Sequence, residues 1–271
     1  MPAVNNTSPI LLRPVNALGK KSLDILNEIG RFSIFSGKAI VRIFSLPLQI
    51  RKTVDQLFFI GVKSWLVIFL VALFTGMVLG LQGYYTLVKF GSQGMLGAVV
   101  ALSLIRELGP VLTAIMIIAR AGSSMAAEIG VMRISEQIDA LDTMDINPIR
   151  FLVSPRVAAS IISFPLLTAL FDVVGILGGY ITGVMMLDIN SGIYFYRIVS
   201  SVDMLDVRGG FAKALFFAVI VTVMCCYQGY YTHTRKHGFG AIGVSNSTTT
   251  AVVLSCVLVL VADYVLTSML L

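Results

Sequence analysis

Residues 102–156, LSLIRELGPVLTAIMIIARAGSSMAAEIGVMRISEQIDALDTMDINPIRFLVSPR, decide the fold. They begin in an apolar segment that Arg106 and Glu107 interrupt, and they pass through a run of small residues at 121–127. A polar amphipathic piece follows at 133–145, and the chain then becomes apolar again. Ionisable residues at membrane depth are costly and mark functional or tightly paired sites. Arg106 and Glu107 at membrane depth, followed by an acidic surface helix, indicate a membrane protein that is coupled to a soluble component.

The composition excludes a water-soluble globule. The chain has 271 residues, of which 57% are hydrophobic and only 13% are charged, against about 25% charged residues in soluble domains. Several apolar segments reach the roughly 20 residues that a helix needs to cross a bilayer. We therefore predict an all-α integral membrane protein with about five transmembrane helices. The predicted spans cover 57–81, 95–119, 157–187, 214–231 and 248–271.

Proline and glycine residues shape these spans. Pro110 follows Gly109 and must bend the second span, because proline cannot donate to the preceding helical turn. The first span carries Gly76 and Gly80 in a GxxxG pattern, and the third carries a glycine at every fourth position across 175–183. Small residues at this spacing let helices pack closely. We therefore expect two close-packing seams.

The N-terminal part is amphipathic rather than apolar. Over 18–44, apolar residues such as Leu18, Ile25 and Phe32 lie near one helical face, and charged residues lie on the other. This stretch is too polar to span, so we predict a helix that lies in the membrane interface. The alternative is a cytoplasmic helix packed on a partner. The expected divisions are a disordered extension (1–17), an interfacial amphipathic helix region (18–52) and a transmembrane domain (53–271).

The basic residues set the expected orientation. Residues 1–63 hold nine of the twenty Lys and Arg residues and only three acids. Since this basic arm leads directly into membrane spans, it indicates a lipid-facing cytoplasmic segment and not nucleic-acid binding. With a cytoplasmic N-terminus and five spans, fifteen Lys and Arg residues fall inside and four outside. The C-terminus is then expected on the outer side of the membrane.

Arg106 and Glu107 are the candidate functional residues inside the membrane. A helix turns by about 100° per residue, so these neighbours are poorly placed to satisfy each other and each needs another partner. We expect Asp172 or Asp263 to pair with Arg106. The two residues then form either the polar wall of a substrate cavity that holds an anionic head group, or a structural ion-pair network.

The piece at 133–145 is the second candidate site. Acidic residues occupy one face, and the other carries Ile134, Ile138, Leu141 and Met144 at helical spacing. We predict a short surface helix between the second and third spans, ended by Asn147-Pro148. It is either a cytoplasmic coupling helix that transmits motion from a soluble motor domain or an ordinary solvated loop helix. Its acids do not fit a calcium-binding loop.

Several catalytic and metal-binding motifs are absent from the sequence. His233 and His237 have the spacing of two metal ligands, but no third ligand accompanies them, so a basic cytoplasmic loop is the better interpretation. The three cysteines form neither a disulfide framework nor a CxxC site. Gly19-Lys20 lacks the rest of a P-loop, and there is no G-x-S-x-G elbow. We therefore expect no metal site, no catalytic residue and no unaided ATP hydrolysis.

With these residues on the page, the chain resembles the MlaE-type permeases of the ABC lipid-transport (Mla) family. The strings that carry the resemblance are GMVLGLQGY (76–84), ALSLIRELGPV (101–111), ARAGSSMAAEIGVMRISEQIDAL (119–141) and ADYVLTSML (262–270). The resemblance covers about residues 20–271. The first twenty residues are an unmatched extension.

The resemblance implies a homodimeric permease of the bacterial inner membrane, with a periplasmic C-terminus and an ABC ATPase subunit under each half. That partner would bind the ATP and Mg, and this chain would bind no cofactor. The resemblance also implies a periplasmic ring of MCE-domain lipid-binding subunits, often with a small STAS-domain protein. Such transporters move phospholipid between the inner and outer membranes, maintaining outer-membrane lipid asymmetry, through a cavity at the dimer centre.

The same resemblance assigns roles to individual residues. The lipid cavity would be lined by Val78, Leu79, Gln82 and Tyr85 at the end of the first span, together with Arg106 and Glu107. The residues that would dock on the ATPase are Glu128, Arg133, Glu136, Gln137, Asp139, Leu141 and Met144.

A transporter or channel driven by an ion gradient is the alternative interpretation. It would use Arg106, Glu107, Asp172 and Asp263 as a proton or ion relay. Against it, the five spans show no inverted repeat, and the acidic surface helix would have no purpose. A membrane-embedded lipid-modifying enzyme is disfavoured because the sequence lacks a clustered His/Asp/Ser constellation.

Overall fold

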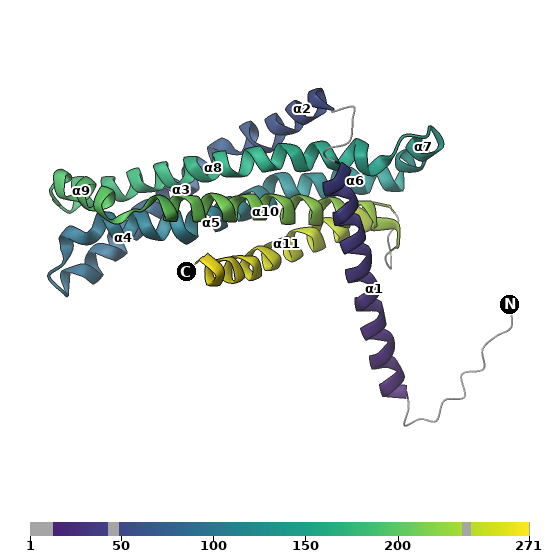
Figure 1. Ribbon diagram of the computed structural model, residues 1–271, viewed down its shortest axis with the longest axis horizontal. Coiled ribbons are helices and arrows are strands. Elements are labelled where there is room, and N and C mark those ends of the chain that lie inside the picture. The colour runs from purple at the N-terminus through teal and green to yellow at the C-terminus, as the bar shows by residue number, and fades with distance from the viewer. Residues whose placement is uncertain (1–12, 43–48, 235–239, 271) are drawn as a thin grey trace.

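The computed structural model describes residues 13–42, 49–234 and 240–270, and within these residues every regular element is a helix. The helices lie along the long axis of an elongated bundle, and α1 (Arg13–Val41) extends crosswise away from one end of it (Figure 1). The predicted all-α fold class is confirmed.

Within the described residues, five helical stretches are long and apolar enough to cross a membrane, as predicted. The second stretch is interrupted by π-helical turns, η5 (Leu104–Leu108) and η6 (Ile118–Gly122). The stretches comprise α2 (Ile50–Ile60) with α3 (Trp65–Val88); α4 (Leu96–Ser103), α5 (Gly109–Ile117) and α6 (Ser123–Ile134); α8 (Ser154–Tyr180); α10 (Met204–Tyr230); and α11 (Gly240–Leu270).

The helices extend beyond the apolar windows predicted for the spans. The first stretch covers Ile50–Val88 where 57–81 was predicted, and α10 begins at Met204 where the fourth span was expected to start at residue 214. Hydropathy locates the part of a helix that crosses hydrocarbon, whereas backbone hydrogen bonding continues into the polar flanks. The early start of α10 matters for function because it brings charged residues into the bundle.

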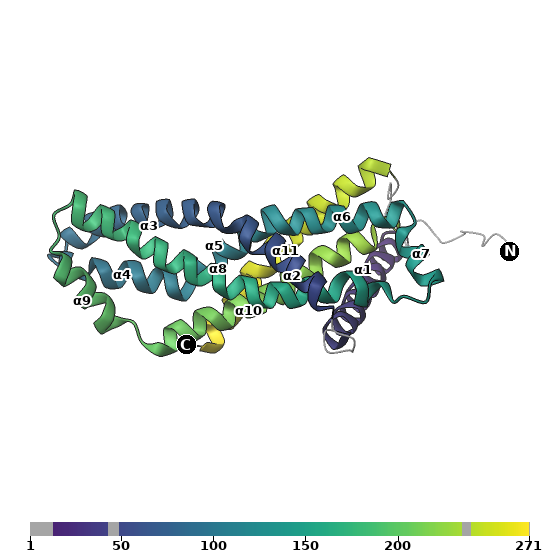
Figure 2. The same ribbon diagram turned by 90° about the horizontal axis from the view of Figure 1, so that it is seen from above.

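The two glycine seams pack against each other. α3 lies along α8 (Figure 2), and a methyl group added to Gly76 would overlap the carbonyl of Gly175. One turn further, a Cβ on Gly80 would lie 3.2 Å from the Cα of Gly179. The prediction of close-packing seams is confirmed, and both seams form one interface between the first and third spans.

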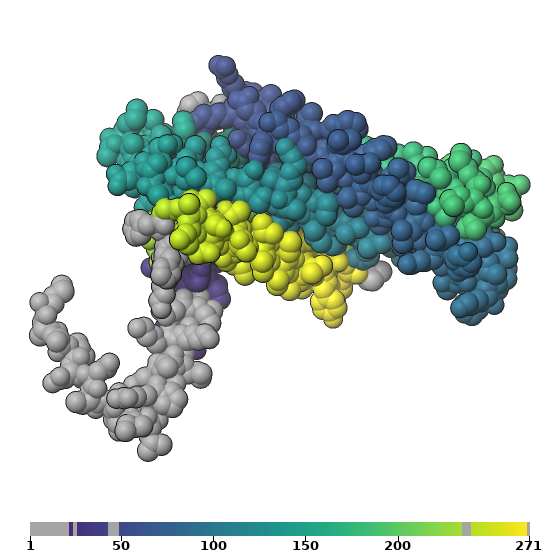
Figure 3. All heavy atoms as spheres, turned by 180° about the vertical axis from the view of Figure 1, so that it is seen from behind, coloured from purple at the N-terminus to yellow at the C-terminus, as the bar shows by residue number. Residues whose placement is uncertain are grey.

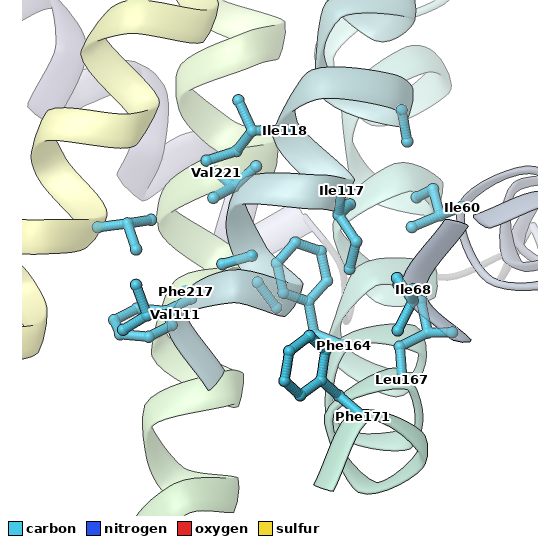
Figure 4. Packing of buried hydrophobic residues seen from close by; sticks show 14 of the residues in the cluster. Ile60, Ile68, Val111, Ile117, Ile118, Phe164, Leu167, Phe171, Phe217 and Val221 are labelled. Carbon is cyan, nitrogen blue, oxygen red and sulfur yellow. The ribbon is translucent and has the colours of Figure 1, made fainter. Parts of the chain in front are cut away.

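Aromatic and branched side chains fill the space between α5, α8 and α10. Phe164 and Phe171 of α8, Phe217 of α10 and Ile117 of α5 are buried together (Figure 4). Truncating a buried phenylalanine to alanine costs roughly 3–5 kcal/mol. This cluster therefore holds the second, third and fourth spans to one another.

α1 is an amphipathic helix that touches the bundle near its own C-terminal end. Phe35 and Ala39 are buried there, and the Phe32 ring lies 5.3 Å from the Tyr227 ring of α10 in an edge-on contact. The extension expected to be disordered, 1–17, overlaps the start of α1 at Arg13; proline is tolerated in a first helical turn, so Pro14 is compatible with this start. Residues 1–12 lie outside the described part of the chain.

A further helix, α9 (Ser191–Ser201), lies between α8 and α10, where the sequence predicted no element. Its N-cap is Asn190, whose side-chain oxygen accepts from the amides of Gly192 at 2.9 Å and Ile193 at 3.2 Å. Tyr194 is fully buried, and its hydroxyl donates to the Ile176 carbonyl of α8 at 3.0 Å. These contacts fasten α9 across one end of the bundle (Figure 2).

α11 covers only part of the bundle. It starts near the end that carries the short helix α7 (Gln137–Thr143), and its C-terminal end lies part-way along α10 (Figure 1). Seen from behind, α11 lies along one edge of the bundle, and α3 and α4 continue beyond its end (Figure 3). The first turns of α10 are therefore accessible next to the last turn of α11.

Candidate functional site

Pro110 leaves one backbone carbonyl of the second span without its usual α-helical donor. Pro110 has no N–H, so the carbonyl of Arg106 cannot receive the usual bond from the residue four positions later. Lys213 of α10 supplies the missing donor, with its Nζ 2.8 Å from the Arg106 oxygen. The sequence predicted a bend at Gly109-Pro110; the structure has the π-helical turn η5 directly before this pair, and Lys213 of another span contacts it.

Arg106 pairs with Asp206, in the first turn of α10. The Arg106 Nε lies 2.8 Å from the Asp206 carboxylate, which also accepts from the Asp203 amide at 3.1 Å as part of a capping box. The expectation that Asp172 or Asp263 would pair with Arg106 is wrong. Residues 204–213 belong to α10, which packs on η5, so the partner comes from a segment between the third and fourth predicted spans.

Lys213 is the centre of the ionic cluster. It is only 3% exposed, and its Nζ lies 2.7 Å from the Glu107 carboxylate and 2.7 Å from the Thr267 hydroxyl of α11. Asp263 lies 3.1 Å away, at ion-pair distance but without hydrogen-bond alignment. The prediction that Arg106 and Glu107 each find a partner elsewhere is confirmed. Three spans converge on this lysine.

Asp172 lies apart from this cluster. It faces Gly109, where an added methyl group would overlap its carboxylate, so only glycine leaves room for the acid at this point. Its Oδ1 has no hydrogen-bond partner among the described residues. Of the four membrane charges expected to form a relay, the structure brings together Arg106, Glu107 and Asp263 and leaves Asp172 separate.

A cavity of about 600 Å³ opens beside the ionic cluster, within the 300–1,000 Å³ that is usual for ligand sites. Leu102 and Ser103 of α4, Arg106 and Glu107 of η5, and Thr267 of α11 contribute to its walls. Its remaining wall is the first part of α10, where small residues leave the space open: Leu205, Asp206, Arg208, Gly209, Gly210, Ala212 and Lys213.

The α3 residues assigned to the lipid cavity do not line this space. Val78, Gln82 and Tyr85 are exposed on α3, and Leu79 packs partly buried against the core. The structure therefore brings only Arg106 and Glu107 of the six expected cavity residues into one pocket. Lipid binding by any of the six stays a prediction.

The acidic surface piece is a helix end followed by a short second helix. α6 ends at Ile134, and Glu136 adopts a left-handed conformation with φ 58° before α7 begins. The boundaries predicted for one helix at 133–145 are therefore wrong, since the turn at Glu136 breaks the continuous pattern. Ile138 is buried as predicted, but Met144 is 67% exposed because α7 has already ended at Thr143.

Arg133 fastens α7 to the rest of the bundle. Its Nη1 donates to Asp139 of α7 at 2.7 Å and its Nε to the Nδ1 of His233 at 2.9 Å, and its guanidinium lies 5.6 Å from the centre of the Tyr230 ring. Burial, and secondarily the Arg133 charge, lowers the pKa of His233 below its ordinary value, so the imidazole is neutral at pH 7 and accepts the hydrogen bond.

The other residues expected to dock on the ATPase differ in their contacts and in their exposure. Glu128 of α6 accepts from the nearly buried Arg156 of α8 at 2.7 Å. Glu136 and Gln137 are exposed, and Leu141 is partly buried on the inner side of α7. The outer face of α7 thus exposes acidic and amide side chains, while its inner side is held in place. No group of three or more metal-ligating side chains occurs among the described residues.

Comparison with known proteins places the chain in a family. The family model described as Permease MlaE matches residues 53–269. The chain belongs to the MlaE permease family. A probable ABC transporter permease protein of Rickettsia bellii is 43% identical, covering 96% of this chain and 98% of that protein.

Two further relatives carry more specific names. The intermembrane phospholipid transport system permease protein MlaE of Haemophilus influenzae is 40% identical over 94% of this chain and 96% of its own length. The chloroplastic protein TRIGALACTOSYLDIACYLGLYCEROL 1 of Arabidopsis thaliana is 35% identical over 87% of this chain and 66% of its own length. As an MlaE-family chain, the protein is the permease subunit of an ABC transporter, which implies a separate ATPase subunit.

Of the residues that line the cavity, sequence reasoning found only Arg106 and Glu107; it missed the charged side chains of Asp206, Arg208 and Lys213 and the hydroxyl of Thr267. The spacing Asp203-x-x-Asp206 is a helix-start signal of the capping-box type, and it could have moved the predicted start of α10 forward. Thr267 carries no comparable signal, because only the packing of α11 against α10 brings its hydroxyl to Lys213.

Proposed function

We propose that this chain is the permease of an ATP-driven transporter that moves phospholipids between the inner and outer membranes of a double-membraned bacterium, and so maintains outer-membrane lipid asymmetry. The observation that carries the proposal is the cavity beside η5, which combines apolar walls with charges held in fixed positions. A phospholipid has apolar tails and a charged head group, and a site for it needs both kinds of surface.

The cavity charges suit a lipid head group because they are oriented before it arrives. Asp206 accepts a hydrogen bond from the Nε of Arg106, yet the Arg106 side chain stays 45% exposed. Its terminal nitrogens can therefore donate to a phosphate oxygen without rearrangement. Glu107 is 40% exposed, so it can meet an ammonium group of a zwitterionic lipid while it keeps its bond to Lys213.

Energy for transport comes from the partner ATPase, which binds the ATP and Mg. The acidic outer face of α7 is the docking surface, and Arg133 links α7 to Tyr230 at the C-terminal end of α10. At 1.5 Å per residue, Asp206 and Tyr230 lie about 36 Å apart along that one helix. In this proposal α10 transmits a movement of α7 to the ionic cluster.

The assembly that this function requires contains two copies of the chain. Val78, Gln82 and Tyr85 are exposed on α3, and a second copy would bring them into a shared lipid cavity. The α7 end faces the cytoplasm and the ATPases. The α9 end faces the periplasm and an MCE-domain ring, with a STAS-domain protein as a further partner. The positive-inside distribution of Lys and Arg supports this orientation.

Lipid transfer from reconstituted vesicles tests the proposal. The permease is incorporated with and without its ATPase, and transfer of a labelled phospholipid is followed after addition of ATP or after a pH gradient is imposed. Transfer that requires both the ATPase and ATP is the expected result. Transfer driven by the pH gradient alone would support the ion-gradient alternative, for which the unpartnered Oδ1 of Asp172 is the favouring observation. Mass spectrometry of a mild-detergent pull-down identifies the partner subunits and bound lipid.

A further inference from the structure

Arg208 differs from the other cations of the cavity because nothing in the described chain neutralises it. Arg106 is paired with Asp206, and Lys213 with Glu107. Arg208 lines the same cavity and is exposed, but among the described residues it has neither an ion-pair nor a hydrogen-bond partner. An arginine left without an anion beside an apolar cavity is available to a ligand.

The position of Arg208 on α10 separates it from Asp206 along the same wall of the cavity. At about 100° per residue, the two side chains lie at opposite edges of the α10 face that lines the cavity, with Gly209 and Ala212 between them. A methyl group on Gly210 would lie 2.5 Å from the Ile105 carbonyl, so α10 lies directly against the start of η5 here. The side that carries Asp206 meets Arg106, and Arg208 flanks the other side.

The chemistry of two guanidinium groups defines the ligand. A guanidinium presents its N–H donors in a planar fork that matches two oxygens of a phosphate. A phosphodiester has two non-bridging oxygens and one negative charge, so one cation without its own carboxylate balances it. Arg106 already has Asp206 as its counter-ion, which leaves Arg208 to supply the balancing charge.

We propose that Arg208 binds the phosphodiester of the transported lipid and makes the cavity select phospholipids over neutral diacylglycerol lipids. This inference rests on the proposed function, because it assumes that the cavity holds a lipid head group. It adds the residue that discriminates between lipid classes. The apolar walls accept the acyl chains of both classes alike, so discrimination has to come from the head group.

Competition between two lipids with the same acyl chains tests this role. The permease–ATPase complex is purified in mild detergent, mixed with equal amounts of dioleoylphosphatidylglycerol and dioleoylglycerol, and the bound lipids are quantified by mass spectrometry. Arg208→Gln should lower the ratio of bound phospholipid to bound diacylglycerol about tenfold or more, the effect of losing a charge-assisted hydrogen bond. Arg208→Lys keeps the charge without the fork and should give a smaller decrease.

Arg197→Gln is the matched control. Arg197 lies on α9, is equally exposed and is absent from the cavity wall, so its loss should leave the ratio unchanged. An unchanged ratio in Arg208→Gln, or an equal decrease in Arg208→Gln and Arg197→Gln, would overturn the role of Arg208 and leave the proposed function standing. Wild-type complex that binds no phospholipid would overturn both. Because Arg208 has no partner in the described chain, its variants should elute from size exclusion like wild type.

Discussion

Replacing Lys213 by methionine should destabilise the permease more than any other change of a single charge in the cavity. The substitution keeps most of the side-chain volume and removes the ammonium that contacts Glu107, Thr267 and the Arg106 carbonyl, at 2.7 to 2.8 Å. Two carboxylates, Glu107 and Asp263, are then left beside each other without a cation.

The magnitude follows from the burial of the three groups. Breaking a buried ion pair by removing one partner costs roughly 3–5 kcal/mol. The lysine is buried, but the Glu107 and Asp263 side chains are 40% and 19% exposed, so partial solvation of the orphaned acids favours the lower end, about 3 kcal/mol. With about 2–4 °C per kcal/mol for a chain of comparable size, the Tm should fall by about 6–12 °C.

The assay is heating of the purified permease in one detergent, followed by size exclusion of the protein that remains folded. Lys89→Met serves as the control, because Lys89 is exposed after the end of α3 and lines no part of the cavity. Adding Glu107→Gln and Asp263→Asn to Lys213→Met should restore most of the lost stability, since the uncompensated charges are then gone. A Tm equal to wild type for Lys213→Met, or a triple variant less stable than the single one, would refute the reasoning.

Three further changes test other parts of the molecule. Gly175→Val should destabilise the α3–α8 seam by roughly 1–3 kcal/mol or more. Gly30→Ala should be neutral or stabilising, because no atom lies within 4 Å of the added methyl group. The heating assay compares the two variants, and an equal decrease of Tm in both would count against the seam. His233 should titrate below its ordinary pKa, because burial and then Arg133 lower it. The free energy of unfolding should therefore decrease as the pH falls through this lowered pKa. NMR of the imidazole should show a higher pKa in Arg133→Gln, and an unchanged pKa would exclude the contribution of Arg133. Glu136→Lys should weaken co-purification of the ATPase while membrane insertion is kept, and full co-purification would remove Glu136 from the docking surface.

The fold class and the five spans could be predicted because both depend on local properties of the sequence. The length of an apolar segment reports a membrane crossing without knowledge of its neighbours, and small residues four apart mark a close approach wherever the partner lies. Gly76 and Gly175 were therefore recognised as packing positions. That they face each other depends on how the spans are arranged, which a single sequence does not encode locally.

The ionic cluster could be predicted only in part. Arg106 and Glu107 stand out because they interrupt an apolar segment. Asp206 and Lys213 lie in the first turns of α10, which are too polar for a hydropathy window to include in a span. The partner of Arg106 was therefore sought among the remaining membrane acids and missed. The turn at Glu136 was missed for another reason, since a left-handed residue other than glycine leaves no periodicity signal. The roles of Val78, Gln82 and Tyr85 came from family resemblance, and a single chain leaves them as predictions.

The contact between Lys213 and the Arg106 carbonyl restrains the second span where η5 meets Pro110. A proline bend usually leaves an acceptor that water or a neighbouring hydroxyl can serve, and the helix can flex about it. Here a nearly buried ammonium occupies that acceptor. Withdrawing the ammonium would strand a carbonyl oxygen at a cost of roughly 1–3 kcal/mol. A change in the backbone hydrogen bonding of this span at η5 is therefore thermodynamically tied to displacement of a charge on α10.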